Sequence, residues 1–323
     1  MDSLYFILQQ TLYFVIPLLI VALGGMFSEK SGIINIALEG IMIIGAFFGI
    51  LFINSMQQSG ALASSPQLLL ILGALVAVIS GIIYSALLAF ASINMKADQT
   101  IGGTALNLLA ASLVIFIART MNNVKQIYFS QVFQIKKVPI LGDIPFIGDI
   151  LFKNTFLTTY IGILILIVSV IILKKTRFGL RLSACGEHPH AAQSVGINVY
   201  KMRWSGVLIS GALGGMGGLA YVIPSMISFG GSVSGYGFLA LAVMIFGQWK
   251  PLRIFFAALF FGFFSALSVT YFKFDFINNI NLANKSDIFK MVPYFATMIA
   301  LAFTSKKSRA PKAEGIPFDP GAR

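Results

Sequence analysis

The chain has 323 residues, of which 57% are hydrophobic and only 11% are charged, and its formal net charge is +12. Soluble domains carry about a quarter charged residues, so this composition excludes an ordinary water-soluble protein. The cations lie in short loops and near the C-terminus and not on one polar face, which argues against nucleic acid as a partner. The single cysteine, Cys185, excludes an internal disulfide framework. Membrane lipid is therefore the expected surrounding of the chain.

Apolar runs follow one another along the sequence, at residues 6–27, 33–54, 67–92, 98–118, 155–173, 204–224, 235–248, 254–272 and 291–304. Crossing the hydrocarbon core takes about 20 helical residues. We therefore predict an all-α polytopic membrane protein with about 9 or 10 transmembrane helices in one bundle. The runs 235–248 and 291–304 are short, so each is a helix with little tilt, a helix extended by neutral flanks, or a re-entrant segment surrounded by protein.

The distribution of Lys and Arg between loops predicts the orientation. With the N-terminus outside, most of these cations lie on the cytoplasmic side, as the positive-inside rule requires. This orientation makes 119–154 an extracytoplasmic loop and 174–203 a cytoplasmic one. We expect residues 1–305 to form one transmembrane domain, followed by a basic cytoplasmic tail at 306–323.

Polar residues inside the first apolar runs are the candidates for a functional path. Asn35 and Glu39 are one helical turn apart, so we expect them to share one face of a helix. A carboxylate at membrane depth costs free energy, which favours a functional or paired role over a structural role at the membrane interface. Thr104 and Asn107, with Gln99, add polar groups to the run 98–118. Ordinary hydrogen bonding between helices is the alternative explanation.

The two long loops contain local patterns of their own. In the loop 119–154, Pro-Ile-Leu-Gly-Asp-Ile at 139–144 is echoed by Pro-Phe-Ile-Gly-Asp-Ile at 145–150, which predicts a turn-rich hairpin or half-helix near the outer membrane surface. In the loop 174–203, Pro189 suits a first helical turn and Gly196 the position after a helix end, so a short helix is expected between them.

Three further motifs are candidates for a chemical role. Cys185, His188 and His190 match no zinc spacing, so we predict no metal site, and no catalytic group is expected either. Ser210–Gly218 has small-xxx-small spacing, which indicates a tight helix contact or, alternatively, a moving transport helix. The Gly-rich stretch 229–237 resembles a flexible ligand loop and lacks the Lys and Ser/Thr of a phosphate-binding loop. If ATP drives this protein, a partner binds the ATP.

The residues 176–203, Thr-Arg-Phe-Gly-Leu-Arg-Leu-Ser-Ala-Cys-Gly-Glu-His-Pro-His-Ala-Ala-Gln-Ser-Val-Gly-Ile-Asn-Val-Tyr-Lys-Met-Arg, resemble the coupling loop of ABC-importer permeases for branched-chain amino acids, simple sugars and nucleosides. The resemblance continues in 31–40, 210–218 and 235–251, and so covers about residues 20–270. Within that family, 97–109 and the echo at 139–150 look most like the nucleoside branch.

This resemblance implies a permease subunit of the bacterial cytoplasmic membrane that takes up a small polar solute, nucleosides first. It implies a cytoplasmic ABC ATPase, a second permease that is a copy or a paralogue, and an extracytoplasmic substrate-binding protein or lipoprotein. No cofactor is expected. The residues implied in ATPase coupling are Gly186, Glu187, Pro189, Ala192 and Gly196, and the expected path residues are Asn35, Glu39, Thr104 and Asn107.

Other functions remain open from the sequence. Within the family, the solute is alternatively a simple sugar, a riboflavin-like molecule or an amino acid. Outside it, a secondary transporter or channel would carry its coupling in ions or broken helices within the membrane.

Overall fold

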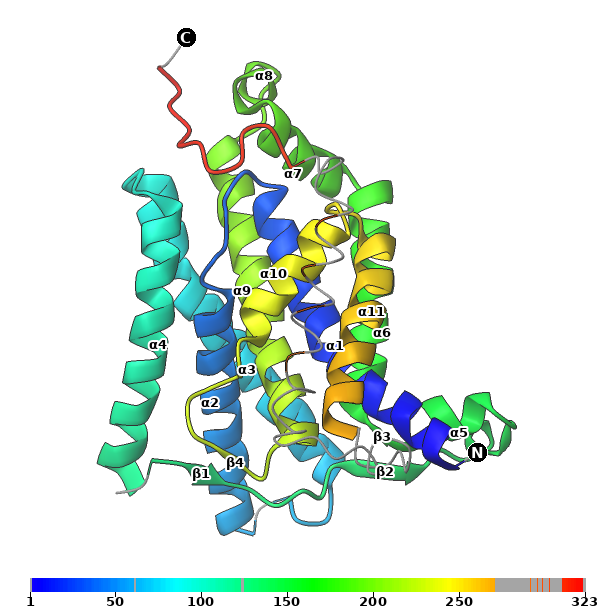
Figure 1. Ribbon diagram of the computed structural model, residues 1–323. Coiled ribbons are helices and arrows are strands. Elements are labelled where there is room, and N and C mark those ends of the chain that lie inside the picture. The colour runs from blue at the N-terminus through cyan, green and yellow to red at the C-terminus, as the bar shows by residue number, and fades with distance from the viewer. Residues whose placement is uncertain are drawn as a thin grey trace.

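The computed structural model describes residues 2–60, 62–122, 125–270 and 310–321, together with the isolated positions 291, 295, 298 and 302 (Figure 1). Its long helices are α1 (Asp2–Glu29), α2 (Leu38–Gln58), α3 (Pro66–Ala89, continued by the π-helical turn η1, Phe90–Asn94), α4 (Gln99–Asn122), α6 (Leu157–Lys175), α9 (Val199–Ser225) and α11 (Pro251–Thr270). The shorter helices are α5 (Ile147–Leu151), α7 (Arg177–Glu187), α8 (Pro189–Ser194) and α10 (Tyr236–Phe246).

Within the described ranges, seven helices are long and apolar enough to cross a membrane. The predicted all-α polytopic fold is therefore confirmed. Each predicted run up to 254–272 coincides with a helix, although α2 begins only at Leu38, five residues later than expected. Most of the predicted run 291–304 lies outside the described residues. The helix α10 has 11 residues, so it is only about 16 Å long, half the thickness of a hydrocarbon core.

The helix α9 lies at the centre of the bundle, where it packs against α1, α2 and α3 (Figure 1). Lipid tails are as apolar as leucine, so helices in a membrane associate through close packing and not through hydrophobicity. The small residues of 210–218 provide that packing. A Cβ atom on Gly215 would lie 2.2 Å from the carbonyl oxygen of Ala77, and one on Gly218 would lie 2.1 Å from that of Met42. The tight-contact interpretation of this motif is confirmed.

The two long loops lie at opposite ends of the bundle, as the charge distribution predicts (Figure 1). One end holds α7, α8 and residues 310–321, which we take as cytoplasmic. The other end holds the start of α1 and α5 together with short strands, β1 (Ile127–Tyr128), β2 (Gln134–Lys137), β3 (Lys153–Phe156) and β4 (Ser228–Phe229). Strand β1 pairs with β4, and β2 pairs with β3; each pair is antiparallel.

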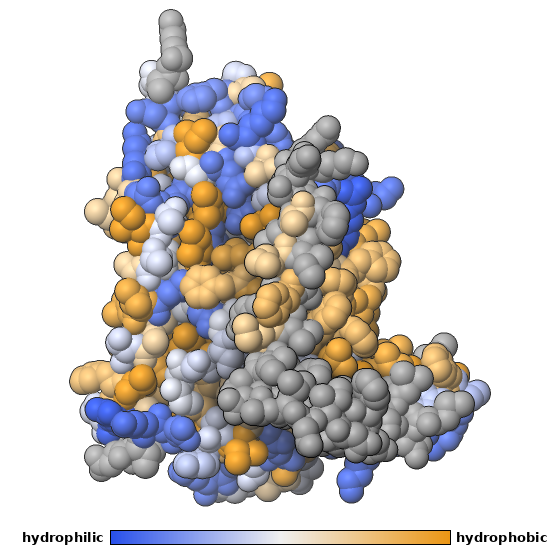
Figure 2. Space-filling view, in the orientation of Figure 1, coloured by the Kyte–Doolittle hydropathy of each residue, from blue (hydrophilic) through white to orange (hydrophobic). Residues whose placement is uncertain are grey.

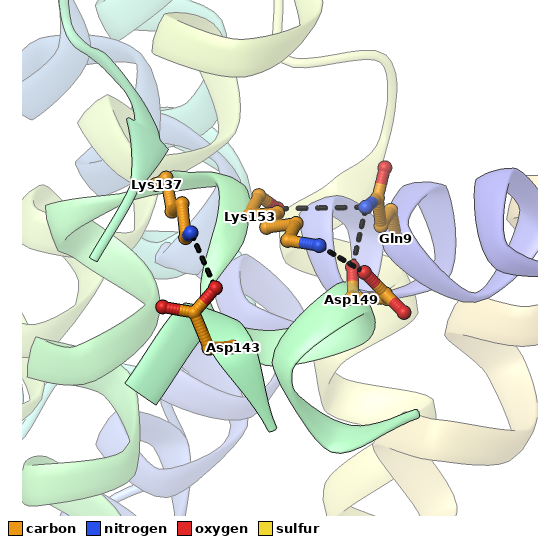
Figure 3. A network of polar contacts seen from close by, with 5 residues as sticks. All are labelled: Gln9, Lys137, Asp143, Asp149 and Lys153. Atoms are coloured by element: carbon orange, nitrogen blue, oxygen red, sulfur yellow. Dashed lines mark hydrogen bonds and ion pairs between the residues drawn. The ribbon is translucent and has the colours of Figure 1, made fainter. Parts of the chain in front are cut away.

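The tandem echo forms the tip of the β2–β3 hairpin. Ile140 and Phe146, at equivalent positions of the two copies, both have positive φ angles, of 67° and 69°. Each copy then makes one helical turn, η2 (Leu141–Asp143) or α5. The equivalent Asp143 and Asp149 pair with Lys137 and Lys153, and Gln9 donates to the carbonyl oxygen of Asp149 at 2.6 Å (Figure 3). The prediction of a turn-rich hairpin is confirmed, and its location on the outer side stays a prediction.

The close packing of α9 generates a stability prediction. Gly215→Ala should lower the free energy of unfolding by about 3 kcal/mol, because the added methyl group meets rigid backbone of α3. The measurement is the thermal midpoint of the purified protein in detergent. Gly102→Ala is the matched control, since no atom of the described residues lies within 4 Å of its Cβ position on α4. It should leave the midpoint unchanged or raise it, because alanine favours helix. Equal loss in both variants would contradict the packing argument.

Candidate functional site

The first functional feature is a break in the helices between α1 and α2, at residues 30–37, where the backbone is not helical. The break lies beside the middle of α9, because Asn35 contacts Ser210 and Gly214 lies against Leu38 and Ile41. Non-helical backbone at this depth needs partners for its polar groups. The helix α4 supplies two of them: Gln99 Oε1 accepts from Ile34 N–H at 2.7 Å, and Asn107 Nδ2 donates to the Ile36 carbonyl at 2.9 Å.

Asn107 also fixes the start of α2. Its Oδ1 accepts from the backbone N–H of Gly40 at 2.7 Å, so both ends of one amide hold the same segment. A Cβ atom on Gly40 would lie 3.0 Å from that oxygen, so the absence of a side chain lets α2 and α4 approach. With these bonds both groups of the Asn107 amide are engaged by backbone. Its role in this structure is to position the break.

A second break, at residues 226–235, leads into the N-terminus of α10. Ser234 and Gly235 have φ angles of 56° and 78°, which turn the chain into the helix. Glu39, in the first turn of α2, closes this end: its carboxylate accepts from Gly235 N–H at 2.9 Å and Gly237 N–H at 2.6 Å. A carboxylate is stabilised at a helix N-terminus by the helix dipole and by the free N–H groups. Glu39 therefore joins the two breaks at the level of α2's start.

The structure corrects the prediction that Asn35 and Glu39 share a helical face. Asn35 lies in the non-helical segment, is fully buried, and donates from Nδ2 to Ser210 Oγ on α9 at 2.8 Å. The sequence suggested a helix because 33–54 is apolar throughout, and hydropathy does not register a break whose polar groups are bonded internally. Asn35 Oδ1 has no hydrogen-bond partner among the described residues.

The second break reaches the surface of the protein on the face between α4 and α10 (Figure 1). Figure 2 shows pale and blue residues on this face within the apolar surface, at mid-height. Thr104 is exposed on α4, and its hydroxyl donates to the carbonyl of Thr100 in its own helix. Ser232 and Ser234, in the second break, are also exposed, and neighbouring Gly231 lies against Val114 of α4. Sequence reasoning named Thr104 and missed both serines, although the Gly-rich stretch around them was a signal.

The segment predicted to be cytoplasmic folds into α7 and α8, two helices joined at His188. Pro189 opens α8 and Gly196 follows its end with φ +82°, so the predicted short helix is confirmed. The predicted coupling residues do not all face outward, however. Gly186, in the last turn of α7, lies against the backbone of Lys30, where a Cβ atom would be 2.4 Å from the carbonyl oxygen, and Ala192 is only 4% exposed. The outward face includes Glu187, His188, His190, Ala191, Gln193, Ser194 and Val195.

Residues 310–321 of the tail form a strap across this end of the bundle, which sequence reasoning did not foresee. Ala313 N–H donates to the Gly186 carbonyl at 2.8 Å, and Gly315 N–H donates to that of Gly32 at 3.1 Å. Arg203 on α9 donates to the Ile316 carbonyl at 3.0 Å. Phe318, 4% exposed, packs with Cys185, Ala192 and Val199. The strap thus contacts α7, α8, α9 and the first break.

A carboxyl pair helps to hold the strap. Glu314 hydrogen-bonds to Glu29 at the end of α1, and Glu29 accepts from Trp249 Nε1 at 2.6 Å. Two carboxyl groups bond to each other only when one is protonated. Burial raises the pKa of Glu314 above its usual value. An acid whose pKa is raised by folding stabilises the docked form at low pH, and that contribution is lost as pH rises through the raised pKa.

The buried ring of Phe318 yields a prediction about the strap. Phe318→Ala should remove about 2 kcal/mol from strap docking, so Cys185 behind it should react about 30-fold faster with a maleimide in the purified protein. Cys185 is fully buried and is the single cysteine of the chain, which makes its labelling a direct readout. Ile316→Ala is the control, because that side chain is 57% exposed. Identical labelling rates in the two variants would show that Phe318 does not hold the strap.

Known proteins resemble the chain over nearly its whole length. A family model described as branched-chain amino acid transport system / permease component matches residues 7–302. The guanosine ABC transporter permease protein NupQ of Bacillus subtilis is 42% identical over 320 residues, covering 98% of this chain and 97% of NupQ. The nucleoside ABC transporter permease protein NupC of Lactococcus lactis is 40% identical over 319 residues, covering 98% of each chain. A putative glucose ABC transporter permease protein of Haloferax volcanii is 30% identical over 268 residues, 81% of this chain and 77% of the relative. No solved structure gives a significant match.

Proposed function

We propose a nucleoside-importing role on the premise that this chain belongs to the permease component family of the branched-chain amino acid transport system. The chain is an ABC transporter permease subunit and a multi-pass integral protein of the cytoplasmic membrane. An ABC system implies an ATPase and a substrate-binding partner. In our proposal, these are a cytoplasmic ATPase, a second permease and an extracytoplasmic binding protein. The expectation that ATP hydrolysis belongs to another subunit fits relatives that are named as transport components.

The observation that carries the proposal is the meeting of two helix breaks at Glu39. Non-helical backbone at membrane depth is tolerated where it is buried in protein or lines a water-filled cavity. The first break is buried and bonded to α4 and α9, whereas Ser232 and Ser234 of the second are exposed beside α4. We infer that the path runs along this face, between α4 and α10. A second permease against the same face would enclose it.

The chemistry of this face fits a neutral solute with many hydroxyl groups. The Glu39 carboxylate, which would otherwise attract cations, accepts from backbone N–H groups of α10. What the face offers instead is the hydroxyl groups of Thr104, Ser232 and Ser234, each able to donate and accept. Ribose hydroxyls and base edges match such groups. The near full-length likeness to permeases named for guanosine and nucleosides favours nucleosides over glucose, whose permease is the more distant relative.

The predicted path residues receive different roles in this proposal. Thr104 contacts the solute, Glu39 and Asn107 hold the two breaks in place, and Asn35 anchors the first break to α9. Weak contacts suffice, because a permeation path has to release what it binds.

Coupling to ATP hydrolysis is assigned to the outward face of α8, with Glu187 and Gly196 at its borders. A short helix that seats in a groove of the ATPase would move as a unit when the ATPase closes. From α8, contact continues through Phe318 to the strap, and from Gly315 to Gly32 at the start of the first break. This route joins the coupling segment to the break that ends at Glu39.

The path assignment predicts an effect of Thr104→Val on transport. Losing one hydroxyl contact of about 1 kcal/mol should slow guanosine uptake by the reconstituted complex about fivefold, with unchanged thermal stability. Thr120→Val is the matched control. Thr120 is also exposed on α4 and bonds to its own helix at the Phe116 carbonyl, but 16 residues further along it points to a different side. Wild-type uptake in Thr104→Val would remove this face from the path, and competition by glucose but not by nucleosides would reject the substrate.

The coupling assignment predicts that Ala191→Arg, on the outward face of α8, abolishes ATPase binding without unfolding the permease. Bulk and charge at a helix-in-groove contact prevent close seating. The measurement is recovery of the ATPase subunit with the purified permease. Ala63→Arg is the control, because Ala63 is an exposed alanine in the turn between α2 and α3 at the other end of the bundle. Ala192→Arg should instead destabilise the permease itself, since Ala192 is buried. Normal ATPase recovery in Ala191→Arg would place the coupling site elsewhere.

A further inference from the structure

A cavity of about 400 Å³ opens at the cytoplasmic end of the bundle, apart from the path face and from α8. It lies between the end of α6, the side of α7 and the turn from α10 to α11. Its lining consists of Lys30, Leu173, Lys174, Ser183 and residues 249–253. None of these residues has a role in the transport path or on the outward face of α8.

Four cationic side chains converge on this cavity: Lys30, Lys174, Lys250 and Arg253. Among the described residues, no carboxylate lies within 4.0 Å of any of them, since the ion pairs found there involve Lys96, Lys137 and Lys153. Arg253 donates to the neutral side chain of Gln248. Positive-inside sorting explains why cations occupy this end, but it does not require four of them around one cavity.

Lys30 is the least exposed of the four cationic side chains. Its side chain is half-buried, and burial lowers the pKa of its ammonium group. Glu187 attracts it from a distance and Lys250 opposes that effect. The other carboxylate nearby, Glu29, is engaged by Trp249 and Glu314. The cavity is therefore left with excess positive charge next to the first turn of α11, whose 20-residue helix adds the positive end of its dipole.

The cavity also lies at the level of lipid headgroups. Lys174 is in the last turn of the membrane-spanning helix α6, and Pro251 is the first residue of the membrane-spanning helix α11. Apolar Leu173 and Leu252 belong to the same lining, and Leu252 is 48% exposed. Basic pockets between helices at the cytoplasmic surface bind anionic headgroups. Apolar groups beside the cations would contact the acyl chains of such a lipid. They would contribute nothing to the binding of a free anion.

We propose that this cavity binds the phosphate of an anionic phospholipid from the cytoplasmic leaflet, with Lys174, Lys250 and Arg253 around the headgroup and Lys30 at its inner wall. Lys30 is also the first residue of the break between α1 and α2. Lipid bound there holds Lys30, and with it the cytoplasmic end of the break, in place, and it thereby stabilises the bundle.

The test is a lipid titration of the full transporter complex in detergent. The thermal midpoint is followed as phosphatidylglycerol, phosphatidylcholine or inorganic phosphate is added. Phosphatidylglycerol should raise the midpoint, and the apparent affinity should fall about 30-fold in Lys250→Gln/Arg253→Gln, since each cation contributes about fivefold. The matched control is Lys175→Gln/Arg177→Gln, which removes two exposed cations of the same end that lie outside the cavity lining. It should change the affinity less than twofold.

Other outcomes overturn the proposal. Equal loss in both double variants would mean general surface charge and no site. A full effect of inorganic phosphate alone would mean a free-anion site. Loss of the ATPase from Lys250→Gln/Arg253→Gln, with unchanged phosphatidylglycerol affinity, would mean that these cations contact the ATPase. If that double variant does not fold, Lys174→Gln at the exposed rim replaces it, with about a fivefold loss expected and an unchanged affinity contradicting the site.

Discussion

Every polar backbone group within a membrane needs a partner, and this constraint governs the whole structure. The breaks at 30–37 and 226–235 interrupt helices and free N–H and C=O groups at depth. Side chains from other helices replace the lost bonds: Gln99 and Asn107 serve the first break, and Glu39 caps α10 at the second. The polar residues at membrane depth thus have a structural reason to exist. In the proposed path, a passing solute would meet the exposed hydroxyl groups of Thr104, Ser232 and Ser234.

The breaks also depend on the close packing of α9, because a non-helical segment needs a rigid neighbour to hold its conformation. Glycines at 211–218 bring α2 and α3 to within contact of the α9 backbone, and Ser210 holds Asn35. In lipid, contacts of this kind supply the association energy that apolar side chains provide in water. The small residues and the breaks therefore belong to one arrangement. The helix that packs most tightly is also the one against which the non-helical segment is anchored.

The cytoplasmic end links these features to the surroundings of the protein. The strap at 310–321 connects α7 and α8 to Gly32 and Arg203, so in the proposed mechanism a displacement of α8 would reach the first break through direct contacts. The proposed lipid site lies at the same break, at Lys30, but approaches it from the membrane side. Two inputs, a partner ATPase and the lipid headgroup layer, would then act on one short non-helical segment.

The sequence alone determined the fold class, the positions of most helices, the short helix between Pro189 and Gly196, and the opposite placement of the two long loops, because hydropathy, Lys and Arg distribution and turn residues are local properties. It also pointed to Glu39 and Asn107, since polar groups in apolar runs are costly. It could not tell that Asn35 lies outside any helix, that Ala192 faces inward, or that the tail returns to cover Cys185. Those facts depend on residues far apart in the chain: Ser210 bonds Asn35, Gly40 bonds Asn107, and Phe318 buries Ala192. Only the tertiary structure decides such pairings. The residue that bonds a polar group or covers an apolar one lies far away in the chain, so the sequence around that group does not indicate its partner.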